Sequence, residues 1–176
     1  MVDTLNNSSA GEQSSLFNDK EADNLPKQKK PVDARTQLRL ELQAKRQAMD
    51  TADVIAKSEA IATHLKPLIS SGSKLAGYLA LGNEVLLDST LIWARTRDCT
   101  TYVPIVEADN KMVFAPYHEH TKLLSNQFGI REPDVTAGEC LKGAELDTVL
   151  VPLVGFDPGC QRMGMGGGYY LSLIHI

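Results

Sequence analysis

The apolar run TVLVPLVGF, residues 148–156, constrains the fold of this chain more than any other segment. It is apolar along its length rather than alternating, which is typical of a strand buried on both faces of a parallel sheet. We therefore expect residues 148–156 to form a central strand. Ligands bind beyond the carboxyl ends of strands in open α/β sheets, so the following segment DPGCQRMGMGGGYY, residues 157–170, is expected to lie at a binding edge.

The remaining patterns predict helices that alternate with strands. Helical spacing and good helix formers predict helices over residues 33–49, 53–69 and 88–97, with Asp33 and Asp88 as N-caps. Within the first helix we expect an apolar face with Leu38, Leu42 and Met49, and another face with Arg35, Arg39 and Arg46. Short apolar runs predict strands over residues 74–81, 100–106 and 112–117, the last two as a hairpin, followed by a loop over residues 129–147. This order predicts an α/β fold with a mostly parallel sheet flanked by helices.

Composition excludes several classes of function. The formal net charge is −4 and the pI is near 5.5, which argues against nucleic-acid binding. No apolar run approaches the roughly 20 residues of a membrane span, and the three cysteines form no C-x-x-C pair, so we expect a cytoplasmic protein with neither a disulfide framework nor a zinc site. Residues 1–33 are polar and predict a disordered N-terminal tail, leaving one folded domain over residues 34–170.

The glycine-rich segment has the composition of an anion cradle. Glycines let backbone N–H groups approach a ligand closely, and Arg162 adds a planar cation suited to phosphate oxygens. Neither common phosphate motif is present, because no Gly-Lys-Ser/Thr occurs and Tyr169 stands where a third glycine of G-x-G-x-x-G would be. A permissive surface loop is the alternative. His118 and His120 alternate as strand ligands do, but no third ligand accompanies them, so we expect no metal site there.

Four sequence blocks together resemble the 5-formyltetrahydrofolate cyclo-ligases, also called methenyltetrahydrofolate synthetases. The phrase VPLVGFDPGCQRMGMGGGYY resembles the family's signature loop, and RTQLRLELQAKRQAM, GYLALGNEV and FGIREP resemble three further elements in the same order. The resemblance implies a three-layer fold similar to NagB/RpiA/CoA transferase-like proteins. It also implies that ATP, with Mg²⁺, phosphorylates the formyl oxygen of 5-formyltetrahydrofolate and that N10 then closes the methenyl bridge. The implied partners are a reduced folate and ATP, and we expect a monomer.

The resemblance also implies roles for individual residues. Arg35 and Arg39 match a nucleotide-contacting basic pair, Glu84 matches the acidic residue that binds the pterin, and Leu79 matches an apolar substrate contact. The nucleotide loop is matched by Arg162, Met163, Gly164, Met165, Gly166, Gly167, Gly168, Tyr169 and Tyr170. Residues Met165 to Tyr169 of that loop also face the folate side, and Arg162 and Tyr169 are the expected catalytic residues. For Arg46 we expect an ordinary solvated face, for Asp157 a turn-shaping role, and for Tyr117 a place near the substrate.

The resemblance stops at residue 171. The family carries a Mg²⁺-binding aspartate after Tyr-Tyr, whereas this chain has Leu171 and then SLIHI. We therefore expect that residues 171–176 are not native, that the domain is incomplete at its C-terminus, and that this chain has little or no turnover; natural divergence is the alternative. Two other functions stay open: a non-catalytic α/β module that binds a phosphorylated small molecule, and a sugar-phosphate isomerase or CoA-transferase-like relative that needs no ATP.

Overall fold

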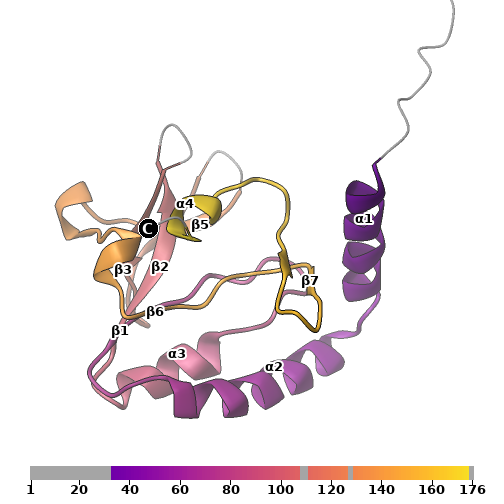
Figure 1. Ribbon diagram of the computed structural model, residues 1–176. Coiled ribbons are helices and arrows are strands. Elements are labelled where there is room, and N and C mark those ends of the chain that lie inside the picture. Colours follow the sequence, from indigo (N-terminus) through magenta and orange to yellow (C-terminus); the bar gives the residue numbers. More distant parts are fainter. Residues whose placement is uncertain (1–32, 108–110, 127–128, 175–176) are drawn as a thin grey trace, which may run out of the picture. The chain divides into compact units, whose positions relative to one another are not determined.

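A computed structural model describes residues 33–107, 111–126 and 129–174 of the chain. The disordered tail predicted over residues 1–33 lies almost wholly outside these residues. Figure 1 shows the described elements, which follow one another in this order: α1 (Ala34–Gln47), α2 (Thr51–Leu65), the 3₁₀ turn η1 (Lys66–Leu68), β1 (Lys74–Ala76), α3 (Asp88–Arg95), β2 (Thr100–Val106), β3 (Met112–Pro116), β4 (Leu123–Ser125), β5 (Arg131–Pro133), the 3₁₀ turns η3 (Ala137–Glu139) and η4 (Gly143–Glu145), β6 (Thr148–Val149), β7 (Gly155–Phe156), β8 (Arg162–Met163) and α4 (Leu171–Ile174).

A four-stranded sheet forms the centre of the described region, in the order β3-β2-β1-β6. Strand β1 pairs in parallel with β2 on one side and with β6 on the other. Strands β2 and β3 pair antiparallel, which confirms the predicted hairpin. Two of the three pairings are thus parallel, as the α/β prediction requires.

The two faces of this sheet carry separate apolar clusters. Neighbouring residues of β1 point to opposite faces, since successive side chains of a strand alternate. Leu75 packs with Leu87, Leu91 and Ala94 of the α3 region, whereas Ala76 packs with Tyr102, Met112 and Phe114 and with the segment that carries α4. Helices α2 and α3 on one face, the sheet, and α4 with η4 on the other face therefore make three layers.

The helix starts are set by side-chain caps. Asp33 caps α1 as predicted, its carboxylate accepting the Thr36 N–H at 3.0 Å. Helix α2 begins at Thr51, not at residue 53, because the Asp50 carboxylate accepts the Asp53 N–H at 2.7 Å. The predicted cap of α3 is wrong: Leu87 is its N-cap residue, and Asp88 is the first helical residue, where its charge favours the positive helix end.

The long strands predicted from apolar runs are shorter in the structure. The run 74–81 is a strand only over β1, and the run 148–156 pairs with the sheet only over β6. The prediction of a central, doubly buried strand at 148–156 is wrong, since β6 is an edge strand of the described sheet and its residues are half-buried. Pro152 lies within this run and offers no N–H to a ladder, which explains the early stop.

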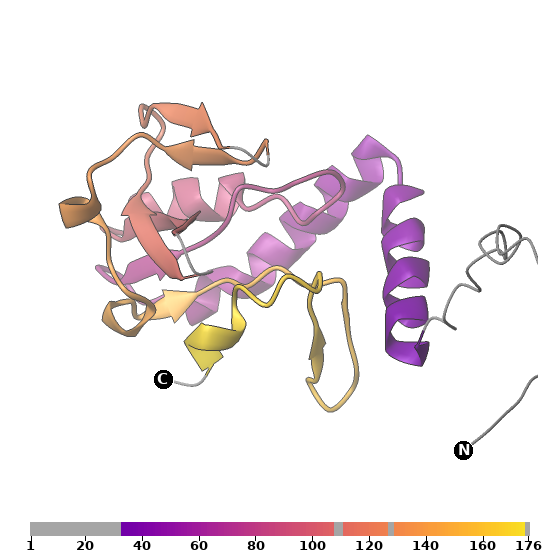
Figure 2. The same ribbon diagram turned by 90° about the horizontal axis from the view of Figure 1, so that it is seen from above.

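Two small hairpins were not predicted. Strands β4 and β5 pair antiparallel, so part of the loop expected over residues 129–147 is a hairpin. Strands β7 and β8 also pair antiparallel, with Gly155 opposite Met163 and Phe156 opposite Arg162. The end of the apolar run and the start of the glycine-rich segment therefore form one hairpin, and this hairpin lies alongside α1 in both views (Figures 1 and 2).

Candidate functional site

Helix α1 lies against the glycine-rich segment through its inner face. Arg39 Nε donates to the Gly164 carbonyl oxygen at 3.0 Å. A Cβ on Gly155 would lie 2.6 Å from Leu42 Cδ1, so the missing side chain lets the β7–β8 hairpin approach the helix. The face that packs carries Arg39, Leu42 and Arg46, whereas Leu38 is 45% exposed, contrary to the predicted apolar stripe.

The turn between β7 and β8 is shaped by Asp157, as expected. Its Oδ1 accepts the Gln161 N–H at 2.9 Å, and its carbonyl oxygen accepts the Cys160 N–H at 2.9 Å. Cys160 adopts a positive φ of 60° in this turn. The aspartate thus fixes the strand that delivers Arg162 and Met163 to the start of the glycine loop.

The glycine loop itself, residues 164–168, is open to solvent over its last four residues. Gly166 and Gly168 have φ values of 107° and 75°, which L side chains rarely adopt. The position of a Cβ on Gly166 is 3.8 Å from Arg39 Nε, so the loop passes directly beside that guanidinium. Exposed backbone beside a cation is the arrangement that an anionic ligand requires.

The residues that flank the loop are partly buried. Arg162 Nη1 donates to the Pro152 carbonyl oxygen at 3.3 Å. Tyr169 and Tyr170 pack at the edge of the cluster around Phe114, and the Tyr169 ring lies over Gly167, where a Cβ would come within 2.6 Å of it. Both tyrosines therefore lead from the loop into α4 while packing on the sheet.

Glu84 is buried, with only 7% of its surface exposed. Its Oε2 accepts the Leu81 N–H at 3.0 Å, and its Oε1 lies 3.9 Å from Arg46 Nη1. Burial, and secondarily the charge of Glu84, raises the pKa of Tyr78 to about 12, while Arg46 opposes this shift. Burial and the same carboxylate also raise the pKa of Tyr170, and Arg162 opposes that shift. Glu84, the two tyrosines and the two arginines therefore share one electrostatic environment.

Arg46 does not lie on a solvated face, so that expectation is wrong. Its side chain is 17% exposed and contacts three separate segments. Besides Glu84, it donates from Nη1 to the Leu153 carbonyl oxygen at 3.2 Å and from Nη2 to Met165 Sδ at 3.8 Å. The sequence signal that marks it is its helical spacing of seven from Arg39, which places both on one face.

Asn83 is a second residue that sequence reasoning missed. Its side-chain Nδ2 lies 2.8 Å from the Met49 carbonyl oxygen and 3.2 Å and 3.3 Å from those of Arg46 and Gln47. It therefore caps the C-terminal end of α1 and ties the segment that carries Glu84 to that helix. A half-buried amide that binds helix-end carbonyls leaves no pattern in a single sequence.

The remaining residues that the sequence singled out make none of the contacts described above between α1, the glycine loop and Glu84. Leu79 is half-buried in the segment between β1 and Glu84, and Arg35 is exposed one turn before Arg39 on α1. Tyr117 is half-buried and packs against the cluster around Leu75. Leu171 is 57% exposed at the start of α4.

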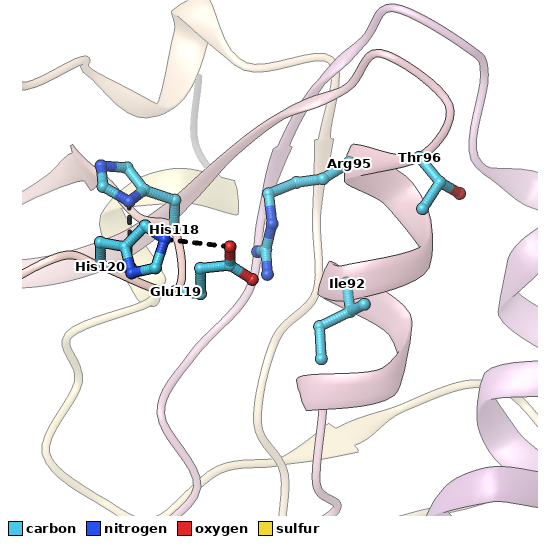
Figure 3. A pocket seen from close by; sticks show the side chains of 6 residues that line it. All are labelled: Ile92, Arg95, Thr96, His118, Glu119 and His120. Carbon is cyan, nitrogen blue, oxygen red and sulfur yellow. Dashed lines mark hydrogen bonds and ion pairs between the residues drawn. The ribbon is translucent and has the colours of Figure 1, made fainter.

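A hollow of about 380 Å³ lies elsewhere, beside the C-terminal end of α3 (Figure 3). It is lined by Ile92, Arg95, Thr96, His118, Glu119 and His120. Because β3 runs antiparallel to β2, His118 and His120 follow β3 near the N-terminal end of β2. The glycine loop instead follows β6, which runs parallel to β1, so it comes after the carboxyl ends of the parallel strands. Among the described residues, no group of three or more His, Cys, Asp or Glu side chains could hold a metal ion.

Comparison with known proteins decides the family. The profile of the family described as the 5-formyltetrahydrofolate cyclo-ligase family matches residues 31–175. The chain belongs to this family. The 5-formyltetrahydrofolate cyclo-ligase of Haemophilus influenzae is 29% identical to it over 142 residues, which cover 77% of this chain and 75% of the relative.

Solved structures agree with this family assignment. The 5,10-methenyltetrahydrofolate synthetase of Aquifex aeolicus superposes with a TM-score of 0.68 at 29% identity and covers 80% of this chain and 72% of its own. The synthetase of Mycoplasma pneumoniae, at 21% identity and a TM-score of 0.59, shares the fold over 81% of this chain and 78% of its own. The predicted fold and the family resemblance are therefore confirmed.

No helix within the described ranges is long and apolar enough to cross a membrane. The cyclo-ligase family assignment also extends to residue 175, past Tyr170. The non-native origin expected for residues 171–176 stays a prediction.

Proposed function

We propose that this family member converts 5-formyltetrahydrofolate to 5,10-methenyltetrahydrofolate, with ATP as co-substrate and release of ADP and phosphate. One observation carries the proposal: a single helix, α1, contacts both halves of the expected site. Arg39 binds the glycine loop at Gly164, and Arg46 lies beside Glu84 on the folate side. The two sets of residues that the family assignment implies are therefore joined by one rigid element.

On the folate side, Glu84 is the residue that orients the pterin. A carboxylate only accepts hydrogen bonds, so it suits the N–H groups along a pterin edge. Because Glu84 is buried, water competes little with the pterin for its carboxylate oxygens, and the Leu81 N–H fixes the position of Oε2. Leu79 supplies an apolar contact, and residues Met165 to Tyr169 close the folate side from the loop.

On the nucleotide side, the glycine loop and the arginines hold the phosphates. Residues 165–168 are exposed, and Gly166 and Gly168 have positive φ, the backbone conformation from which anion-binding concavities are built. Arg39 of α1 contacts the loop at Gly164, and we assign the phosphates also to Arg35, one turn earlier on α1, and to Arg162 of β8. Met163, Gly164 and Tyr170 complete the cradle as the flanks of the loop.

The chemistry is phosphoryl transfer followed by ring closure. The formyl oxygen takes the γ-phosphoryl group of ATP and ADP leaves; N10 then attacks the activated carbon, the C–O bond to phosphate breaks, and N10 loses its proton. Such transfer depends mainly on positioning and on neutralising charge. We assign Arg162 the developing phosphate charge and Tyr169 the positioning of the reacting formyl group.

Mg²⁺ is proposed to accompany the ATP. Mg²⁺ usually keeps several waters and is held by one or two carboxylates together with the phosphates of the substrate. Within the described ranges, no group of three or more His, Cys, Asp or Glu side chains could hold a metal ion, and Leu171 stands where the resemblance implies the family's Mg²⁺-binding aspartate. Position 171 therefore supplies no carboxylate for Mg²⁺, and no step above is assigned to the metal.

The partners of the protein follow from this chemistry. We propose a reduced folate and ATP as its ligands, and a cytoplasmic monomer as its working form. Its three cysteines, Cys99, Cys140 and Cys160, are free thiols, as a reducing compartment favours.

The test is a coupled product assay on the purified chain and on Leu171→Asp. Both are mixed with ATP, Mg²⁺ and 5-formyltetrahydrofolate, and the absorbance of methenyltetrahydrofolate and the release of ADP are followed together. We expect equal amounts of the two products, formed only when the folate is present, and faster in Leu171→Asp. Product formation in neither protein would overturn the proposed reaction, and equal rates in both would overturn the role given to position 171.

A further inference from the structure

We propose that Arg46 is a positioning residue that couples the folate-binding carboxylate of Glu84 to the glycine loop. The inference rests on the proposed function, because it takes Glu84 as the pterin partner and the loop as the nucleotide cradle. Arg46 itself contacts neither ligand in this account. It acts through the residues that do.

The guanidinium of Arg46 joins segments that are distant in sequence. Its Nη1 lies 3.9 Å from Glu84 Oε1 and donates to the Leu153 carbonyl oxygen at 3.2 Å. Its Nη2 lies 3.8 Å from Sδ of Met165, in the exposed part of the glycine loop. One planar group therefore contacts the folate-side carboxylate, the apolar run before the loop, and the loop itself.

The contact between Arg46 and Glu84 leaves the carboxylate able to bind a ligand. A separation of 3.9 Å is longer than a hydrogen bond, so the attraction is between charges and does not occupy a lone pair of Oε1. Both side chains are mostly buried, at 17% and 9% exposure, so water screens the pair weakly. Arg46 therefore compensates the buried negative charge while Oε1 stays available.

Hydrogen bonds to the backbone around Arg46 and Glu84 keep the two side chains close to each other. The Asn83 amide binds carbonyl oxygens at the end of α1, including that of Arg46 itself, and Leu81 N–H holds Glu84 Oε2. The segment 81–84 therefore cannot move away from α1 without breaking these contacts. Through Arg39 and Gly164, the same helix is bound to the loop. A shift of the loop on nucleotide binding is then transmitted along α1 to Glu84.

Nε of Arg46 adds a further observation. It is buried and has no hydrogen-bond partner within the part of the chain that the structure describes. A buried unsatisfied N–H is costly, which a purely structural arginine would avoid. We take Nε as the donor that a protein acceptor reaches when the loop shifts on nucleotide binding, while Arg46 itself contacts neither ligand.

The experiment is a double-mutant cycle read by calorimetry. The affinity for 5-formyltetrahydrofolate is measured for the unchanged chain, Arg46→Gln, Glu84→Gln and the double variant, each with and without a non-hydrolysable ATP analogue. Lys45→Gln is the matched control, since Lys45 is an exposed cation one residue before Arg46 on the same helix. Arg46→Lys tests whether charge alone suffices, and urea unfolding of each variant reports its folding.

We expect Arg46→Gln to weaken folate binding about tenfold and to abolish the gain in folate affinity that the ATP analogue gives. The double variant should bind no more weakly than Glu84→Gln alone, because Arg46 acts through that carboxylate. Arg46→Lys should recover part of the affinity but not the gain from the nucleotide. Lys45→Gln should behave as the unchanged chain.

The failures are distinguishable. If Glu84→Gln binds the folate normally, the proposed folate site is wrong and this inference falls with it. If Glu84→Gln is weakened but Arg46→Gln is not, or if the two losses simply add, the proposed function stands and the positioning role of Arg46 is overturned. Loss of folding in Arg46→Gln together with normal binding by Arg46→Lys, both with and without the ATP analogue, would also overturn it.

Discussion

Arg39 Nε donates to the carbonyl oxygen of Gly164 at 3.0 Å. This hydrogen bond joins α1, the first helix of the described region, to the glycine loop near its other end. Arg39 and Gly164 are 125 positions apart in the sequence. The contact places a fixed cation beside the exposed glycines, and it lies on the same helix as Arg46.

Replacement of Arg39 by Gln should weaken binding of an ATP analogue by about tenfold or more. The change removes a cation beside the loop and a charge-assisted hydrogen bond. Loss of that bond should lower the free energy of unfolding by about 1–3 kcal/mol. Calorimetry and urea unfolding measure the two effects. Lys45→Gln on the outer face of α1 should change neither, and unchanged ATP affinity in Arg39→Gln would remove Arg39 from the nucleotide site.

Two alanine substitutions in the same loop should differ sharply. Gly166 has a φ of 107°, so Gly166→Ala should cost about 1–2 kcal/mol and disturb the loop that presents its N–H groups. Gly164 has no positive φ, and the nearest atom to its missing Cβ is Arg162 Nη1 at 3.7 Å, so Gly164→Ala should be tolerated. Urea unfolding and ATP-analogue binding compare the pair. Equal behaviour of the two variants would contradict the backbone argument.

The protein should lose stability in alkali because of Tyr78. Burial raises the pKa of Tyr78 to about 12 from its ordinary value of 10, so between these values the unfolded chain loses a proton that the folded chain keeps. Stability is thus fully present below pH 10 and falls as the pH rises toward 12. Urea unfolding across this range should show a smaller decline for Tyr78→Phe than for the unchanged chain. An identical decline in both would exclude Tyr78 as a cause.

Position 171 should control the response to Mg²⁺. Leu171 lies three residues after the glycine loop and is 57% exposed, so we expect an aspartate there to present carboxylate oxygens to the bound phosphates. Leu171→Asp should bind the ATP analogue more tightly in Mg²⁺ than in its absence, whereas the uncharged Leu171→Asn should show no such gain. A Mg²⁺ response of the same size in Leu171→Asn would show that the carboxylate is not responsible.

Local signals in the sequence predict much of the fold. The N-cap of α1 and the β2–β3 hairpin depend on neighbouring residues, and both are confirmed. Strand ends depend instead on which backbone groups find a partner. The apolar run 148–156 was predicted as a central strand although it contains Pro152, which has no N–H for a ladder, and it lies at an edge of the described sheet. The β4–β5 hairpin was missed for the same reason, since its strands are three residues each.

The site residues that belong to a sequence motif could be predicted. Those that are brought together only by packing could not. The glycine loop and Glu84 follow from a family resemblance that the comparisons confirm, although their roles stay predictions. Arg46 was predicted on a solvated face because its partners, Glu84 and Met165, are distant in sequence and only the fold brings them to it. Asn83 binds backbone carbonyls alone, which any residue offers, so no pattern could reveal it.

The central claim is that the glycine loop and the segment around Glu84 form one site, joined by α1. Amide hydrogen exchange of the chain tests it most directly, measured without ligand, with an ATP analogue, and with 5-formyltetrahydrofolate added to that complex. We predict that the analogue slows exchange in residues 164–168 and in α1 around Arg39, and that the folate then slows exchange in residues 81–84. Slowed exchange only beside α3 and His118, or no change in either segment, would contradict the account.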